Sequence, residues 1–333
     1  MYLAESYTIA IIFSILSMLC WGSWVNSQKI AAKSWRFELF YWDYNLGLLV
    51  TAAIFAFTLG NLANSNGGFP ENIKEASLSN IGSCLLGGVI FNISNILMVM
   101  AVAIAGMAVG VSVTVCISLV IGVIINYLGA PSGNPVWLFA GVALVVVSIV
   151  FNALAYRGMA ASTDHKTSKG LQLAVSSGIL MGFFYRFVAR TMPSDFSQIE
   201  SGQLSPYTAV FIFIAGVFLS NFLLNTYIMK RPIEGKPLDY NEYFKGGFKN
   251  HLAGILGGLV WCMGMMFSIL GGAKAGFAIS YGLGQAAVII AVLWGIFVWK
   301  EFKDAPKKTG IYLSIMMVLF IIGIICMILA RYF

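Results

Sequence analysis

Residues 81–128 read IGSCLLGGVIFNISNILMVMAVAIAGMAVGVSVTVCISLVIGVIINYL, a run without a single Asp, Glu, Lys or Arg. A helix needs about twenty apolar residues to cross the hydrocarbon core of a membrane, so this run is long enough for two crossings. Hydrophobicity scarcely falls along the run. Gly106 marks the division that we predict between two helices, Ile81–Ala101 and Met107–Leu128. The stretch therefore predicts an α-helical protein that lies in lipid.

The composition of the whole chain points to the same class of protein. Of its 333 residues, 59% are hydrophobic and 10% are charged, whereas soluble domains carry about 25% charged residues. We predict an all-α integral membrane protein with ten transmembrane helices. The other eight predicted helices are Thr8–Ser27, Leu39–Leu62, Val136–Tyr156, Leu171–Met192, Tyr207–Met229, Leu252–Gly271, Phe277–Trp299 and Ile311–Ala330.

Lysine and arginine are distributed unevenly among the loops between these helices. The odd-numbered loops carry fifteen, the even-numbered loops and both termini carry four, and Arg186 lies within the sixth helix. Cytoplasmic loops are enriched in Lys and Arg, so we predict that both termini lie outside, with the chain in a bacterial inner membrane. The net charge of +7 then indicates contact with anionic lipid rather than with nucleic acid.

The two halves of the chain share a pattern at a constant offset of 170 residues. Leu86-Gly87-Gly88, for example, recurs as Leu256-Gly257-Gly258. The pattern predicts one five-helix repeat at 1–157, a cytoplasmic linker at 158–169 and a second repeat at 170–333. Because five is odd, the second repeat would lie inverted relative to the first. Inverted repeats are typical of transporters, whose substrate sites lie near the midplane between the repeats.

The sequence also resembles the ureide permease family of the drug/metabolite transporter superfamily, along nearly the whole chain and in the same order. The resembling motifs are Met1-Tyr2 with Glu5-Ser6, Trp42-Asp43-Tyr44, Gly87-Gly88-Val89 with Asn95, Val120-Ile121-Gly122, Ile125-Asn126-Tyr127, Tyr207-Thr208-Ala209, Gly271-Gly272-Ala273 with Ala275-Gly276, and Trp294-Gly295-Ile296 with Glu301. Plant ureide permeases also carry a long central segment with an ATP-loop-like motif. The central loop here is short and has no GxxxxGK[ST], so ATP-driven transport is not supported.

This resemblance implies a fold of ten helices in two inverted five-helix repeats. It also implies secondary active uptake, commonly proton-coupled, of ureides such as allantoin and of oxo-derivatives of nucleobases. The same superfamily includes bacterial L-rhamnose and glucose or ribose permeases, which leaves a sugar as an alternative substrate. Neither a cofactor nor a metal is implied; H⁺ is the expected coupling ion, and Na⁺ remains an alternative.

Asp43 is the acidic residue that falls clearly inside a predicted span. Ionisable residues inside membranes are rare and usually functional, so we predict that Asp43 carries the coupling proton. The alternative is an interfacial carboxylate that pairs with Lys33 or Arg36 beside an aromatic belt. The matching Asp-Tyr of the resembling family favours the functional interpretation.

Polar side chains near the midplane are candidates for binding the substrate. Asn92 and Asn95 share one face of the third helix, and Tyr281 and Gln285 share one face of the ninth. Their amides and hydroxyl suit a small neutral solute with carbonyl and N–H groups, or with hydroxyls. The alternative role for such residues is hydrogen bonding between helices.

Two tryptophans and one arginine complete the predicted substrate site. Trp261 and Trp21 could stack on a planar ureide ring or on the apolar face of a sugar, although membrane tryptophans more often anchor at the interface, as we expect for Trp24. Arg186 could bind an anionic substrate, and its plainer role is to snorkel to the outer surface.

Other classes of protein fit the sequence less well. The two histidines, His165 and His251, fall in predicted cytoplasmic loops, and there is no HExxH motif for an intramembrane enzyme. A channel is disfavoured because the chain shows no charged ring, and a lipid or drug exporter would call for a wider apolar cavity. We therefore expect a small-molecule substrate. The sequence leaves monomer and dimer both open.

Overall fold

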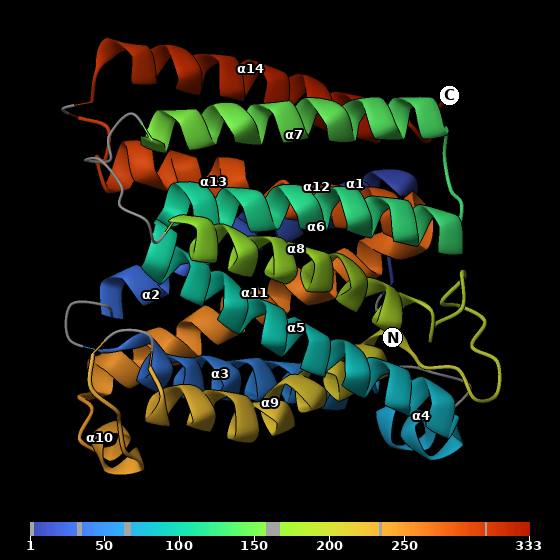
Figure 1. Ribbon diagram of the computed structural model, residues 1–333. Coiled ribbons are helices and arrows are strands. Elements are labelled where there is room, and N and C mark those ends of the chain that lie inside the picture. Colours follow the sequence, from blue (N-terminus) through green and yellow to red (C-terminus); the bar gives the residue numbers. More distant parts are fainter. Residues whose placement is uncertain (1–2, 32–34, 63–67, 158–166, 233–234, 304) are drawn as a thin grey trace.

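The computed structural model describes residues 3–31, 35–62, 68–157, 167–232, 235–303 and 305–333 (Figure 1). Within these residues, ten helices are long and apolar enough to cross a membrane, which confirms the predicted class and helix number. In chain order, the elements are α1 Tyr7–Ser23, α2 Val25–Ala31, α3 Phe37–Phe57, α4 Phe69–Glu75, α5 Leu78–Ala105, α6 Met107–Gly129, α7 Pro135–Arg157, α8 Thr167–Ala189, α9 Pro206–Lys230, α10 Tyr240–Phe244, α11 Phe248–Ala275, α12 Phe277–Gln285, α13 Val288–Leu293, the π-helix η1 Trp294–Val298 and α14 Lys307–Leu329.

The long helices lie side by side in layers (Figure 1). Helices α7 and α14 pack on each other and form one outer layer, and α3 and α9 pack together on the opposite side of the molecule. Between them, α5 packs on α8 and α9, α6 packs on α8, and α11 packs on α1 and α3. The predicted linker at 158–169 falls mostly outside the described residues, and the division into two repeats stays a prediction.

Local sequence determines where several helices begin and end. Ser77 and Ser205 cap α5 and α9, each accepting a hydrogen bond from the third residue beyond it. Gly106, at φ 78°, ends α5 and begins α6, and Gly276, at φ 91°, does the same between α11 and α12. Glycine adopts positive φ without the steric cost that a side chain imposes. The predicted break at Gly106 is confirmed.

Two of the crossing helices are broken, which the sequence interpretation did not predict. The first crossing is interrupted at Trp24, after the Gly22-Ser23 pair, and the ninth is interrupted at Ala286 and continues through α13 into η1. Gly/Ser pairs and π-bulges are recognised causes of kinks. The predicted span Phe277–Trp299 is confirmed as the crossing Phe277–Val298, but its local irregularity at Ala286 was not predicted, because length and apolarity do not reveal it.

Four glycines allow two pairs of helices to cross closely. A Cβ atom at Gly258 of α11 would meet the backbone of α3 at Tyr44, and one at Gly47 of α3 would meet the backbone of α11. In the same way, a Cβ atom at Gly88 of α5 would meet the backbone of α9, and one at Gly216 of α9 would meet the backbone of α5. Small residues let membrane helices approach each other in this way. Gly88 and Gly258 are 170 residues apart, which is the offset between the two halves of the sequence. The corresponding glycine of each half thus lies at a close helix crossing.

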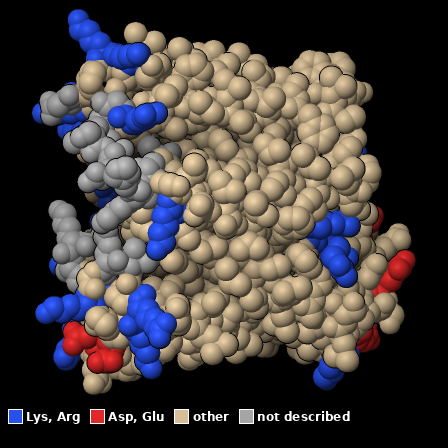
Figure 2. Space-filling model, in the orientation of Figure 1, with Lys and Arg blue, Asp and Glu red and all other residues tan. Residues whose placement is uncertain are grey.

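The two ends of the helix bundle differ in charge. We call the end that carries Lys29, Arg36, Lys230 and Lys300 the basic end. At the opposite, terminal end, the two ends of the chain meet, because the Tyr7 hydroxyl donates to the Ile328 carbonyl oxygen at 2.5 Å. Charged side chains lie toward these two ends, and a wide belt of other residues separates them (Figure 2).

Candidate functional site

A cavity of about 120 Å³ lies between the helices in the half of the bundle nearer the basic end. Its walls come from the end of α5, the start of α6 and the end of the first crossing, all of which lie toward that end. The residues that line it are Trp21, Gly22, Trp24, Val25, Phe91, Asn95, Met98, Val111, Thr114, Val115, Met181, Phe184, Trp261, Gln285, Ala287, Val288 and Ala291. We call this space the central cavity.

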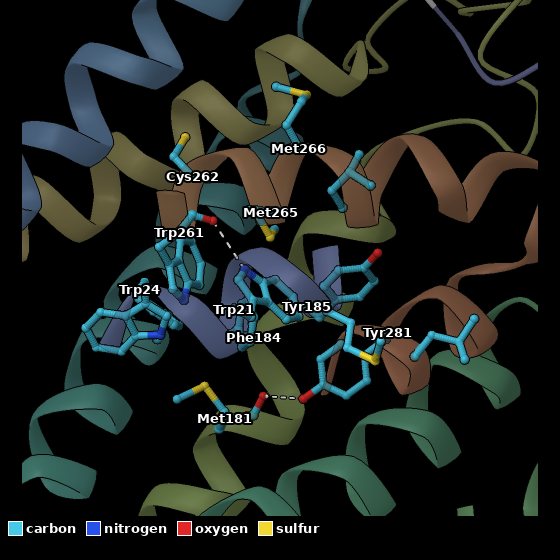
Figure 3. Packing of buried hydrophobic residues seen from close by; sticks show 14 of the residues in the cluster. Trp21, Trp24, Met181, Phe184, Tyr185, Trp261, Cys262, Met265, Met266 and Tyr281 are labelled. Atoms are coloured by element: carbon cyan, nitrogen blue, oxygen red, sulfur yellow. Dashed lines mark hydrogen bonds between the residues drawn. The ribbon is translucent and has the colours of Figure 1, made fainter. Parts of the chain in front are cut away.

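Aromatic rings form one side of the central cavity (Figure 3). The indoles of Trp21 and Trp261 are stacked, with ring centroids 5.6 Å apart and an interplanar angle of 23°. The Trp21 Nε1 donates to the Trp261 carbonyl oxygen at 3.2 Å, which fixes the ring of Trp21 against α11. Phe91 lies 4.5 Å from the Trp261 ring, centroid to centroid, and continues the aromatic surface.

A few polar groups reach this apolar space. The Asn95 Nδ2 donates to the Tyr41 hydroxyl at 3.1 Å, and the Gln285 Oε1 accepts from the Ser118 hydroxyl at 3.4 Å. Both amides line the cavity, together with Thr114. Small-molecule sites typically combine apolar walls with a small number of fixed polar groups. The central cavity has this composition.

Both interrupted crossings have their interruption beside the central cavity. Trp24 lies between α1 and α2, Ala287 lies between α12 and α13, and both residues line the cavity. The backbone of both residues stays in the helical region of φ and ψ, so the two crossings are locally irregular there and not unwound.

The two broken helices are joined to each other at the basic end. The Trp299 Nε1, just beyond η1, donates to the Asn26 Oδ1 of α2 at 2.6 Å. Lys29 of α2 forms an ion pair with Glu301. These contacts join α2 to the end of the ninth crossing.

Asp43 occupies a second buried site, outside the lining of the central cavity. It is 1% exposed, and its carboxylate accepts from the Tyr243 hydroxyl at 2.6 Å and from the Trp35 Nε1 at 3.3 Å. The Nδ1 of His251 lies 2.9 and 3.0 Å from the two carboxylate oxygens. We call Trp35, Asp43, Tyr243 and His251 the Asp43 cluster.

The Asp43 cluster corrects two sequence-based expectations. Arg36, one proposed partner of Asp43, pairs instead with Glu38 at 2.5 Å, and Lys33, the other, lies outside the described residues. His251 does not lie in a loop, because α11 begins at Phe248 rather than Leu252 and carries His251 in its first turn. An apolar run marks only the part of a helix that spans the hydrocarbon core. Helix α11 begins before its apolar run, in a first turn that contains polar residues.

Tyr243 reaches Asp43 from α10, a short helix between the long ones that the sequence interpretation missed. Burial raises the pKa of the Tyr243 hydroxyl, and its hydrogen bond to Asp43 and the charge of that carboxylate raise the pKa further. A raised pKa keeps the phenol protonated at physiological pH. Tyr243 therefore remains a hydrogen-bond donor to Asp43.

Three of the predicted substrate-binding residues lie outside the lining of the central cavity. Asn92 bridges helices, because its Oδ1 accepts from Tyr41 at 2.8 Å and its Nδ2 donates to Ser220 at 2.9 Å. The Tyr281 hydroxyl donates to the Met181 carbonyl oxygen at 3.1 Å (Figure 3). Arg186 donates to the Gly129 carbonyl oxygen at 3.1 Å, toward the terminal end.

Other residues of the site escaped the sequence interpretation. Trp24, expected as an interfacial anchor, is 6% exposed and lines the cavity, as do Thr114 and Phe184. Nothing in the sequence separates these residues from ordinary core residues of apolar helices. Among the described residues, no group of three His, Cys, Asp or Glu side chains could hold a metal ion; that no cofactor is needed stays a prediction.

Lipid blocks the passage of polar solutes. A small cavity between helices that cross the membrane, ten of them in the described part of the chain, is the architecture by which membrane proteins move such solutes. The fold and the site thus define a multi-pass membrane transporter.

The family of this transporter follows from its sequence. A model of the ureide permease family matches residues 40–173 and 160–330, and the chain belongs to this family. It is 25% identical to Ureide permease 1 of Arabidopsis thaliana over 97% of each chain, and 23% identical to Ureide permease 2 of the same plant over 96% of each. The relatives are named permeases, so the chain is a transporter and not an enzyme.

Two further similarities concern a segment and the fold. Over 74 residues, the chain is 35% identical to a Staphylococcus aureus protein named "Probable glucose uptake protein GlcU", a match that covers 22% of this chain and 26% of that one. A crystal structure of a protein 17% identical in sequence superimposes with a TM-score of 0.59 over 97% of this chain and 98% of the other. This second likeness shows the fold alone.

Proposed function

We propose that the protein is a secondary active transporter that takes up a small, neutral, planar solute of the ureide or nucleobase class together with a proton. The observation that carries this proposal is the central cavity, which is lined by stacked indoles and by two amide side chains. The names of the relatives, ureide permeases, supply the substrate class.

The dimensions and chemistry of the central cavity favour such a solute. An apolar cavity of about 150 Å³ in another protein holds one benzene ring, so about 120 Å³ suits a single small ring. A flat ring can stack on the faces of Trp21 and Trp261. The amides of Asn95 and Gln285 each offer a donor and an acceptor, which match the C=O and N–H groups of a ureide.

The charge asymmetry of the bundle supports an orientation. Cytoplasmic loops are the ones enriched in Lys and Arg, so the basic end would lie in the cytoplasm and both termini outside. The central cavity then lies in the cytoplasmic half of a bacterial inner membrane. Buried aromatic side chains such as Phe91, Phe184 and Tyr281 separate it from the outer face.

The Asp43 cluster supports a proton as the coupling ion. The groups that contact the carboxylate are a phenol, an indole N–H and an imidazole, which donate hydrogen bonds or exchange protons. A metal cation such as Na⁺ would call for a shell of oxygen acceptors instead. A buried carboxylate beside a histidine fits the proton relays of membrane transporters.

The packing of the helices supports alternating access between two related halves. Helix α1 packs on α11 and α12, and α8, at the corresponding position of the second half, packs on α5 and α6. The equivalent glycine crossings of α3 with α11 and of α5 with α9 fit the same relation. Rocking of such halves about a central site is the mechanism expected for inverted repeats.

A thermal-shift screen of the purified protein in detergent tests the substrate class. Allantoin, uracil or xanthine should raise the melting temperature, because a ligand that binds the folded state stabilises it. Gln285→Met keeps the volume and removes the amide, so the Kd for the same ligand should rise about tenfold or more. Gln172→Met, on an exposed part of α8 outside the cavity lining, is the matched control and should bind like the wild type.

A sugar is the second candidate substrate, favoured by the local match to the glucose uptake protein. The apolar face of a sugar can stack on the same tryptophans. A melting shift with L-rhamnose, ribose or glucose and none with allantoin or nucleobases would overturn the ureide proposal. An unchanged Kd in Gln285→Met would show that the substrate does not bind in the central cavity.

A further inference from the structure

A second and larger cavity, of about 510 Å³, opens at the terminal end of the bundle. We call it the terminal vestibule. The turn before α7, the loop after α8, the turn between α11 and α12 and the end of the chain form its walls. Its lining residues are Ala130, Pro131, Ser132, Ser194, Asp195, Gly272, Ala273, Lys274, Gly276, Phe277 and Arg331.

The terminal vestibule presents both donors and acceptors. Lys274 carries an ammonium group, and the Arg331 Nη1 donates to the Ser132 hydroxyl at 2.7 Å. Asp195 is the acceptor: hydrogen bonds from the Ser197 backbone N–H and hydroxyl hold the pKa of its carboxyl below its usual range, so it stays ionised. Cations beside a carboxylate suit a neutral solute that carries carbonyl oxygens and N–H groups.

The walls of the terminal vestibule are held together by contacts between distant segments. The Asn134 backbone N–H donates to the Ala330 carbonyl oxygen at 2.5 Å, which fixes the end of the chain to the turn before α7. Gly276, at φ 91°, lies so close to Ser132 that an added Cβ would collide with the serine side chain. The shape of the vestibule is therefore set in part by the backbone.

A column of aromatic rings connects the terminal vestibule with the central cavity. Phe277 lines the vestibule and lies 6.3 Å from the ring of Tyr185. The rings of Tyr185 and Tyr281 are 5.0 Å apart, and Tyr281 is 6.3 Å from Phe184, which lines the central cavity. All four side chains are buried, and Figure 3 shows three of them, Tyr185, Tyr281 and Phe184, beside the central tryptophans.

Hydrogen bonds hold this aromatic column closed. The Tyr185 hydroxyl donates to the Ser268 carbonyl oxygen at 3.1 Å, and the Tyr281 hydroxyl donates to the Met181 carbonyl oxygen at 3.1 Å. Each bond joins two helices, α8 with α11 and α12 with α8. A solute could pass from one cavity to the other only if these helices part.

We propose that the terminal vestibule is a second substrate site, which binds the solute by its carbonyl and N–H groups before the aromatic column opens toward the central cavity. This inference rests on the proposed function, because it takes the same class of solute and the same orientation. The inference adds an entry site that carries charged side chains, whereas the side chains that line the central cavity are all neutral.

Uptake kinetics in intact cells test the second site. The double variant Lys274→Met with Arg331→Met removes both cations, so the KM for uptake should rise about tenfold or more, since hydrogen bonds to charged groups are among the stronger ones. A melting shift with the solute in detergent should persist, because the double variant leaves the central cavity unchanged. Lys74→Met, on the exposed α4 at the same end, is the matched control. An unchanged KM in the double variant would overturn the inference.

Cysteine labelling gives an independent readout. Ser132→Cys should react with a membrane-impermeant thiol reagent added outside, with loss of uptake, and substrate should slow the reaction. Glu75→Cys, exposed in α4, should react without loss of uptake, and wild-type cells control for the native cysteines. If Ser132→Cys does not react, or reacts without effect on uptake, the second site is excluded. Failure of the proposed function would look different: wild-type cells would take up none of the ureides, nucleobases or sugars.

Discussion

Asp43→Asn is expected to abolish accumulation of the substrate against a gradient, while exchange of labelled for unlabelled substrate across the membrane continues. Asparagine keeps the size of the side chain and can still hydrogen-bond to Tyr243, but it cannot take up or release a proton. Uptake into proteoliposomes driven by an inward proton gradient should fall to the level seen without a gradient. Exchange under symmetrical conditions should stay within about twofold of the wild type, because the central cavity is untouched.

Asp239→Asn is the matched control for this prediction. Asp239 is exposed at the same end of the bundle, just before α10, and its side chain makes no capping hydrogen bond. This variant should accumulate substrate like the wild type. If Asp43→Asn still concentrates substrate, Asp43 is not the coupling residue. If it loses exchange as well, Asp43 is needed for the architecture rather than for coupling.

Gly258→Val is expected to prevent the protein from folding to a stable, monodisperse form. The added side chain would meet the backbone of α3 at Tyr44, Gly47 and Leu48. Backbone cannot move aside as a flexible side chain can, so α3 and α11 must separate. The destabilisation should reach at least about 3 kcal/mol, the upper end for overpacked cores. Size-exclusion chromatography and the melting temperature in detergent measure the loss.

Gly82→Val provides the comparison on an equivalent long helix. Gly82 lies in α5, where an added Cβ would meet nothing within 4 Å. The variant should melt close to the wild type, since valine is compatible with a lipid-exposed helix. A wild-type melting temperature for Gly258→Val would mean that α3 and α11 do not cross as closely as the glycines indicate.

Most of the fold could be predicted from the sequence because lipid imposes a strict length and apolarity on each crossing. The break at Gly106 was also predictable, since glycine can adopt the positive φ that ends α5. The breaks at Trp24 and Ala286 were not, because they depend on how neighbouring helices pack. Helix α11 was predicted four residues too short at its start, and this error hid His251.

The sequence could predict the residue types of the candidate site and their depth in the membrane. It could not predict which of these residues meet in one cavity. Trp21, Asn95, Trp261 and Gln285 lie on four different helices, and the structure brings them to one cavity. Arg186, near the end of α8, lies toward the terminal end, as its position in the sequence indicates. Sequence position fixes the depth of a residue in the membrane, whereas the side of the helix that faces the cavity depends on tertiary packing. Their roles in binding and coupling stay predictions.

If the solute binds in the central cavity as proposed, the stacked indoles of Trp21 and Trp261 limit how tightly the transporter holds it. Each ring already has an aromatic partner 5.6 Å away, and such a pair contributes about 0.5–1.5 kcal/mol. A solute that inserts between them must first separate them, and its net gain from stacking shrinks accordingly. Modest affinity favours rapid release of the solute, so we expect a low affinity and a high turnover rate. Selection among solutes would then depend on hydrogen bonds to the amides, which an unsubstituted hydrocarbon ring cannot form.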